Sequence, residues 1–93
     1  MPARLSNDQI QAALPGIPGW KCDGKQISAR FRFEDFAGAM AFVNRVAKLA
    51  EAANHHPDID IRWNVVTLVL STHSAGGLTA ADFQLAAEVG PAE

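Results

Sequence analysis

The sequence predicts an α+β fold in which three helices pack on one face of a four-stranded antiparallel sheet. Two pairs of segments alternate apolar and polar residues across short connections, as antiparallel hairpins do. Three other segments carry apolar residues at helical spacing behind a capping residue. The predicted order is helix, two strands, helix, two strands, helix. A sheet with helices on one face buries all of these apolar sides together.

Two helices begin with the spacing of a capping box, in which a side chain and a backbone N–H three residues apart bond reciprocally. Ser6-Asn-Asp-Gln9 starts the first helix, which we expect to run through Leu14 before a segment rich in Pro and Gly. Thr79-x-x-Asp82 starts the last helix, expected to reach about Val89. Asp82 therefore has a structural interpretation, as a cap, besides any role in a site.

The longest helix is predicted from Asp35, a plausible N-cap, to about Ala53. Its expected buried stripe is Phe36, Met40, Val43, Val46, Ala47 and Ala50, widened by Phe42, Leu49 and Ala53. This stripe is wider than one sheet face requires. We expect one flank of the helix to be available for burial against another subunit.

Four strands follow from period-two patterns and turn residues. The first hairpin is predicted over residues 20–22 and 26–33, with Asp23-Gly24 as its tight turn. The second pairs residues 58–63 with residues 65–72 through a bend near Asn64. Trp63 alternates with two isoleucines in that strand, so core packing is its default interpretation and a pocket wall the alternative.

Composition limits the class of protein. A chain of 93 residues, 48% apolar and 19% charged, is expected to form one globular domain over residues 1–93. A net charge of −2 gives no electrostatic reason to bind nucleic acid, and no apolar run approaches the roughly 20 residues of a membrane span. Cys22 is the single cysteine, and the N-terminal residues lack the apolar core of a signal peptide, so we expect a cytoplasmic protein.

The three histidines of the chain are predicted to converge. His55 and His56 are adjacent, and His73 follows the next apolar strand. Residue 64, the expected bend, is the midpoint between positions 55 and 73. Positions 55 and 73 should therefore lie side by side at the open end of the hairpin, opposite the bend. Imidazole is the side chain whose unperturbed pKa lies closest to neutrality. The sequence therefore predicts a pocket for proton transfer, lined by all three rings.

Two acidic residues are expected near these rings. Glu51 lies four residues before His55, which on a helix places it one turn back on the same side. We expect its carboxylate to hold one nitrogen of His55 and fix the tautomer. Asp82 is expected near the same pocket, at the start of the last helix. Three histidines with Asp82 could also bind zinc, but adjacent histidines rarely point at one ion, and no metal is predicted.

These residues resemble the pterin-4a-carbinolamine dehydratase family over nearly the whole chain. The resemblance is carried by Glu51-x-x-x-His55-His56-Pro57, Trp63, Ser71-Thr72-His73, Gly76-Gly77-Leu78-Thr79, Asp82 and the early Gly19-Trp20 pair. The chain departs from the family pattern at three places. It has Ile59 where members often have Trp, and Trp63 where they often have Tyr. It has Ala80-Ala81 where they often have a charged pair before the aspartate. These departures concern contacts in the pocket wall and substrate preference.

The resemblance implies a dehydratase that converts 4a-hydroxytetrahydrobiopterin to quinonoid dihydrobiopterin and water. Such an enzyme recycles the pterin cofactor of aromatic amino-acid hydroxylases, forms homodimers or homotetramers, and needs no metal or cofactor of its own. The catalytic role is carried over to His55, His56 and His73. Our hypothesis makes His55 the acid at the hydroxyl, with His73 or His56 as base. Glu51, Asp82 and Trp63 are expected to bind or orient the substrate.

Two other functions remain open at this point. Some family members serve as dimerisation partners of a transcription factor through their helical surface, and the wide stripe on the long helix would suit such a partner. A related enzyme acting on another pterin, such as one on the molybdenum-cofactor route, is the third possibility.

Overall fold

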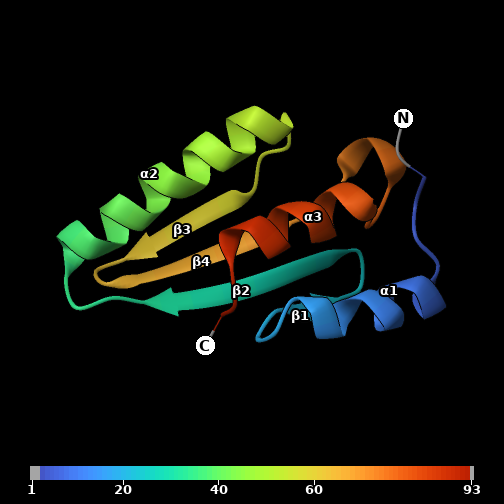
Figure 1. Ribbon diagram of the computed structural model, residues 1–93, viewed down its shortest axis with the longest axis horizontal. Helices are drawn as coiled ribbons and strands as arrows, with labels where there is room; N and C mark the ends of the chain where they lie inside the picture. The colour runs from blue at the N-terminus through green and yellow to red at the C-terminus, as the bar shows by residue number, and fades with distance from the viewer. Residues whose placement is uncertain (1–2, 93) are drawn as a thin grey trace.

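The computed structural model describes residues 3–92 and has the predicted order of elements (Figure 1). The helices and strands are α1 (Asn7–Ala13), β1 (Lys21–Asp23), β2 (Gln26–Arg32), α2 (Phe36–Ala53), β3 (Asp58–Arg62), β4 (Val65–Leu70) and α3 (Ala80–Val89). Two short 3-10 helices, η1 (Leu14–Gly16) and η2 (His73–Ala75), lie between them. The predicted α+β class and element order are confirmed.

The four strands form one antiparallel sheet in the order β1-β2-β4-β3. Arg62 pairs with Val65, which leaves residues 63 and 64 as the turn of the second hairpin, as predicted. The same register places Asp58 opposite Val69. The segment before β3 and the segment after β4 therefore emerge at the same end of the sheet.

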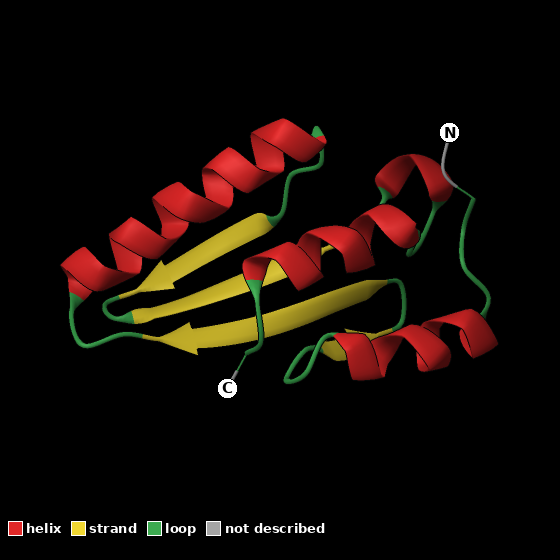
Figure 2. Cartoon of the chain, viewed as in Figure 1, coloured by secondary structure: helices red, strands yellow, loops and turns green. Residues whose placement is uncertain are grey.

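One face of the sheet carries the core, and the helices lie over it (Figure 2). Alternate residues of β2 and β4 face the helices in register and are buried: Ile27 opposite Leu70, Ala29 opposite Leu68, and Phe31 opposite Val66. Trp20, just before β1, is buried in this core, and its indole N–H donates to the carbonyl of Gly90, just after α3, at 3.0 Å. Within residues 3–92, no helix lies over the opposite face of the sheet (Figure 2).

Helix α2 begins as predicted, because Asp35 caps it through a 2.8 Å bond from the N–H of Gly38. Its buried stripe is centred differently from the prediction. The fully buried side is Ala39, Phe42, Val46 and Ala50. Phe36 is 48% exposed, and Ala47 and Ala53 are also exposed. Since the sheet covers only a narrow part of the helix, the outer apolar residues of the predicted stripe stay at the surface.

The edge strand β3 differs most from expectation, because all five of its residues are exposed. Ile59 and Ile61 lie on the helix side by register but remain 40% and 36% exposed. Trp63 is 67% exposed and occupies the hairpin turn with φ of 55°, so its core interpretation was wrong. A strand with a neighbour on one side only, and no helix pressed fully against it, cannot bury a large side chain.

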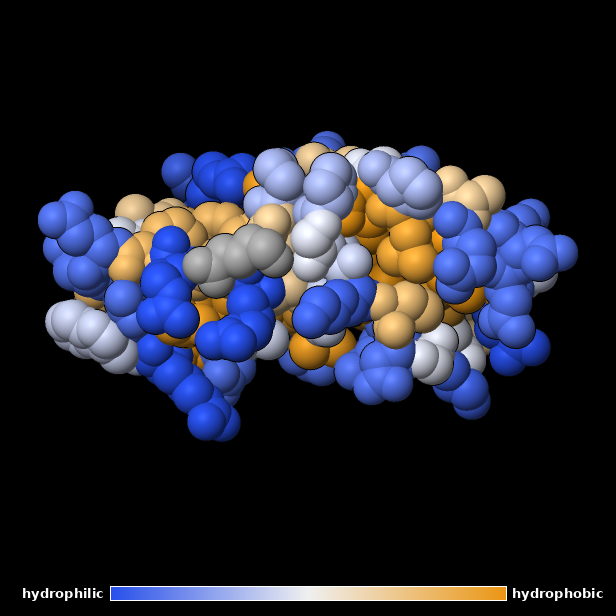
Figure 3. Space-filling model, turned by 90° about the horizontal axis from the view of Figure 1, so that it is seen from below, coloured by the Kyte–Doolittle hydropathy of each residue, from blue (hydrophilic) through white to orange (hydrophobic). Residues whose placement is uncertain are grey.

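The surface seen from below mixes hydrophilic side chains with apolar areas left uncovered (Figure 3). Within residues 3–92, no helix has the length and apolarity needed to span a membrane.

Candidate functional site

The site begins where α2 ends, at a left-handed turn. Asn54 has φ of 50° and ψ of 44°, and its N–H bonds back into the last turn of the helix. The N–H of His55 then donates to the carbonyl of Ala50 at 3.1 Å. This pattern is a Schellman motif, in which a left-handed residue, here the tolerant Asn, reverses the chain and satisfies the last carbonyls. His55 therefore leaves the helix instead of continuing it.

The reversal brings His55 against the first turn of α3. Its Nε2 lies 2.6 Å from Oδ1 of Asp82. The carboxylate is fully buried, and the imidazole is 15% exposed. The shielding of this pair from water makes the contact both stronger and more orienting than a surface pair.

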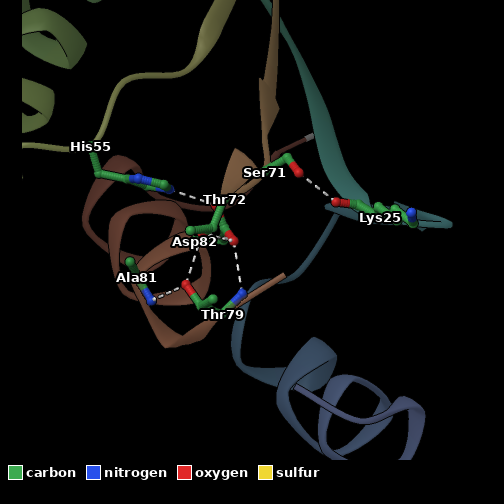
Figure 4. Close-up of polar contacts among 7 residues, drawn as sticks. All are labelled: Lys25, His55, Ser71, Thr72, Thr79, Ala81 and Asp82. Carbon is green, nitrogen blue, oxygen red and sulfur yellow. Dashed lines mark hydrogen bonds and ion pairs between the residues drawn. The ribbon is translucent and has the colours of Figure 1, made fainter. Parts of the chain in front are cut away.

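Asp82 is held by other donors on its second oxygen, Oδ2 (Figure 4). The backbone N–H of Thr79 donates to it at 2.9 Å, completing the predicted capping box of α3, and the hydroxyl of Thr72 donates at 2.8 Å. Asp82 thus caps the helix and contacts a histidine at once. Each oxygen of the buried carboxylate therefore has at least one hydrogen-bond partner.

Glu51 contacts a different histidine from the one predicted. Its Oε2 lies 2.5 Å from Nε2 of His56, while His55 is taken by Asp82. The four-residue rule assumes a continuous helix, and α2 has already ended at Ala53. The Glu51–His56 pair is open to water, with side chains 77% and 57% exposed. The two adjacent histidines therefore have separate carboxylates in contrasting environments.

His73 lies at the same end of the sheet, directly after Thr72, where it begins η2 and is exposed. Figure 1 shows η2 and the end of α2 beyond the same end of the strands. The hydrogen bonds through Asp82 connect the His55 segment to Thr72, the neighbour of His73. Contact of all three rings with one ligand stays a prediction. Trp63 lies at the far end of β3, so a single chain does not bring it to the histidines.

A hollow of about 510 Å³ lies between the end of α2 and α3. It is lined by Ala53, Ala81, Gln84, Leu85, Ala87 and Glu88. Its walls include the last residue of α2 and the neighbour of Asp82, but not the imidazoles. In the part of the chain that the structure describes, no group of three or more His, Cys, Asp or Glu side chains is arranged to hold a metal ion.

The arrangement is suited to proton transfer. An imidazole backed by a buried carboxylate has a fixed orientation and tautomer, as in Ser-His-Asp enzymes, which leaves its other nitrogen to give or take a proton. Sequence reasoning missed Thr72, which joins β4 to this carboxylate. The signals were present in Ser71-Thr72-His73 and in the capping box, but only the fold shows that the two segments meet.

The chain is similar to known proteins over almost its whole length. The family described as "Pterin 4 alpha carbinolamine dehydratase" matches residues 3–91. A Nocardia farcinica protein named "Putative pterin-4-alpha-carbinolamine dehydratase" is 54% identical over 85 residues, covering 91% of this chain and 90% of the relative. A Roseiflexus castenholzii protein of the same name is 54% identical over 89 residues, covering 96% of both chains.

Two solved structures share the fold. The crystal structure of a transcriptional coactivator/pterin dehydratase from Brucella melitensis superposes with a TM-score of 0.89 at 33% identity, covering 92% of this chain and 94% of that one. A pterin dehydratase-like protein, identified as a RuBisCO assembly factor in the alpha-carboxysome, superposes with a TM-score of 0.62 at 26% identity, covering 78% of this chain and 84% of that one. The resemblance seen in the sequence is confirmed, and the chain belongs to the pterin 4 alpha carbinolamine dehydratase family.

Proposed function

We propose that this protein is a 4a-hydroxytetrahydrobiopterin dehydratase that uses histidine acid–base catalysis. The observation that carries the proposal is the 2.6 Å contact between His55 and the buried Asp82, at the end of the sheet where His56 and His73 also lie. The lone thiol of Cys22 supports a reducing, cytoplasmic setting. The product would return to the pterin pool that aromatic amino-acid hydroxylases use.

The reaction needs two proton transfers and no change of oxidation state. A protonated imidazole gives its proton to the 4a-hydroxyl, and the C4a–O bond breaks to release water. A neutral imidazole takes the proton from N5, and the electrons of the N5–H bond form the new C4a=N5 double bond. Two imidazoles in opposite protonation states near neutral pH are sufficient for both transfers.

We assign the acid to His55, because its carboxylate partner is buried and holds the ring in one orientation. Its partner is Asp82 in place of the Glu51 we expected from the sequence. His73 or His56 is the base, and the third ring positions the pterin. Because water surrounds the Glu51–His56 pair, we assign Glu51 a weaker orienting role than Asp82.

We further propose that the protein works as a homodimer, or as a homotetramer built from it, and that Trp63 enters the site through the second copy. The exposed isoleucines of β3 favour an edge-to-edge contact. In an antiparallel pairing centred on Ile61, Asp60 faces Arg62 of the second copy, an attractive cross-strand pair. That pairing carries Trp63 of the second copy opposite Ile59, toward the histidine end. The indole of Trp63 would then contact the substrate held at the histidines of the other copy, which it cannot reach within its own chain.

A binding function is the second candidate. The solved structure from Brucella melitensis is titled a transcriptional coactivator as well as a pterin dehydratase, and the exposed apolar residues of α2 would suit a helical partner. A dehydratase for another pterin is the third. An intact set of three histidines favours retained chemistry over a binding role alone.

Stopped-flow dehydration of a freshly generated 4a-carbinolamine tests the enzymatic proposal. The purified protein should remove water well above the spontaneous rate with 4a-hydroxytetrahydrobiopterin, and a panel of related pterins would rank its preference. A rate equal to the spontaneous one with every pterin would reject the enzymatic function and leave the binding function.

A further inference from the structure

The hydroxyls of two threonines form a hydrogen-bond chain that ends on the Asp82 carboxylate, and each hydroxyl donates toward that carboxylate. Oγ1 of Thr72 lies 2.8 Å from Oδ2 of Asp82 and 2.8 Å from Oγ1 of Thr79. All three residues are buried, at 6%, 0% and 0% exposure for Thr72, Thr79 and Asp82. The hydrogen-bond chain joins two parts of the fold: Thr72 follows β4, whereas Thr79 caps α3 and Asp82 lies in its first turn.

The donor of each bond follows from the number of hydrogens available. An ionised carboxylate only accepts, so the single hydroxyl hydrogen of Thr72 is given to Asp82. Thr79 must then donate its own hydroxyl hydrogen to Thr72, while its oxygen accepts the N–H of Ala81 at 3.3 Å. Oδ2 also receives the N–H of Thr79. Both donors to Oδ2 are therefore fixed by the fold.

With Oδ2 occupied, Oδ1 is the oxygen left for the imidazole. His55 reaches it through Nε2, so that nitrogen carries the hydrogen and Nδ1 is left for chemistry. We propose that Thr72 and Thr79 are positioning residues, which hold the Asp82 carboxylate in one orientation and so make Nδ1 the reacting nitrogen of His55. The effect on turnover rests on the proposed dehydratase function, whereas the effect on the tautomer does not.

Thr72→Val tests this directly, since valine keeps the shape of threonine and carries a methyl group in place of the hydroxyl. Thr72→Ser restores the hydroxyl, and Ser71→Ala is a matched control, because the neighbouring Ser71 hydroxyl bonds the carbonyl of Lys25 at 2.7 Å instead of Asp82 (Figure 4). Two quantities are measured: the tautomer of His55 from ring ¹⁵N chemical shifts, without substrate, and kcat and KM from stopped flow. Circular dichroism confirms that each variant is folded.

We expect wild-type His55, once neutral, to be almost entirely the Nε2–H tautomer. In Thr72→Val the Asp82 carboxylate keeps only the N–H of Thr79 on Oδ2 and is free to turn away from the imidazole. The ring should then become a mixture of tautomers, and kcat should fall about tenfold with KM unchanged within twofold, short of the about 10²–10⁴-fold that loss of a general acid or base costs. Thr72→Ser and Ser71→Ala should match the wild type in both readouts.

A folded Thr72→Val with wild-type tautomer or wild-type kcat overturns the proposal. So does an Nδ1–H tautomer in the unmodified protein, which needs no variant and decides the matter if Thr72→Val does not fold. If the wild-type protein lacks dehydratase activity, the tautomer alone is the test. A mixed tautomer in the variant would then support the threonine chain while rejecting the proposed function.

Discussion

Nε2 of His55 and Oδ1 of Asp82 lie 2.6 Å apart, although the two residues are separated by 27 positions in the chain. The relationship depends on two helix ends. The left-handed turn at Asn54 ends α2 and releases His55, and the capping box of α3 fixes Asp82. A structural motif at each helix end thus places one half of the proposed catalytic pair.

Asp82→Asn should invert the tautomer of His55. Thr72 and the N–H of Thr79 both donate to the position of Oδ2, so the amide oxygen of the asparagine must lie there. The amide NH₂ then faces Nε2, which has to accept, and the hydrogen moves to Nδ1. We expect kcat to fall by about 10²–10⁴-fold. Stopped flow measures kcat, and ring ¹⁵N chemical shifts measure the tautomer. A variant that keeps both wild-type activity and the Nε2–H tautomer would show that Asp82 does not orient His55.

The two capping boxes should differ in their contribution to stability. Thr79→Ala should lower the free energy of unfolding by about 3 kcal/mol, because it removes the cap of α3 and leaves buried partners unsatisfied. Ser6→Ala removes the equivalent cap of α1 at the surface and should cost about 1 kcal/mol or less. Urea unfolding measures both, with Thr79→Ser as the control expected near the wild type. Equal losses from the two alanine variants would argue against the buried network.

Glu51→Gln should have a small effect. Both partners of the Glu51–His56 pair are mostly exposed, so water and salt weaken the interaction. We expect the free energy of unfolding to change by less than about 1 kcal/mol. Asp8→Asn, which neutralises an exposed carboxylate on α1, is the control and should change it by a similarly small amount. The loss in kcat should be smaller than for Asp82→Asn. A larger loss than that variant shows would mean that His56, and not His55, carries the carboxylate-dependent step.

Ile61→Lys should separate the proposed dimer. The charge would lie at the centre of the β3 pairing, where a second copy covers an exposed isoleucine. Light scattering should show the molar mass falling to that of one chain, with circular dichroism unchanged, and KM should rise because Trp63 of the second copy is lost. Ile61→Val is the control and should stay associated. An unchanged mass for the folded lysine variant would reject pairing through β3.

Local patterns determined most of the fold in advance. Alternation in β2, the cap at Asp35 and the two capping boxes are short-range features, and the structure has each of them. The strand ends were less predictable. β4 stops at Leu70, two residues before the predicted end, and the hydroxyl of Thr72 turns to Asp82 instead. Such an ending depends on a contact with a distant segment, which no local pattern carries.

For the candidate site, the sequence predicted which end of the sheet the histidines share, but not which carboxylate contacts which histidine. Histidine spacing around the turn placed His55 and His73 at one end of the sheet, and the register of the hairpin bears this out. The pairing of Glu51 failed because one left-handed residue, Asn54, cancels the helical geometry on which the four-residue rule depends. The exposure of Trp63 was missed because alternation alone cannot distinguish an edge strand from a central one.

We propose above that the imidazoles at this end of the sheet perform the two proton transfers. The most direct test is single-turnover stopped flow on His55→Ala, His56→Ala and His73→Ala with 4a-hydroxytetrahydrobiopterin. His55→Ala should lose about 10²–10⁴-fold in rate, and at least one of the other two should show a comparable loss. Near-wild-type rates in all three folded variants would contradict the claim.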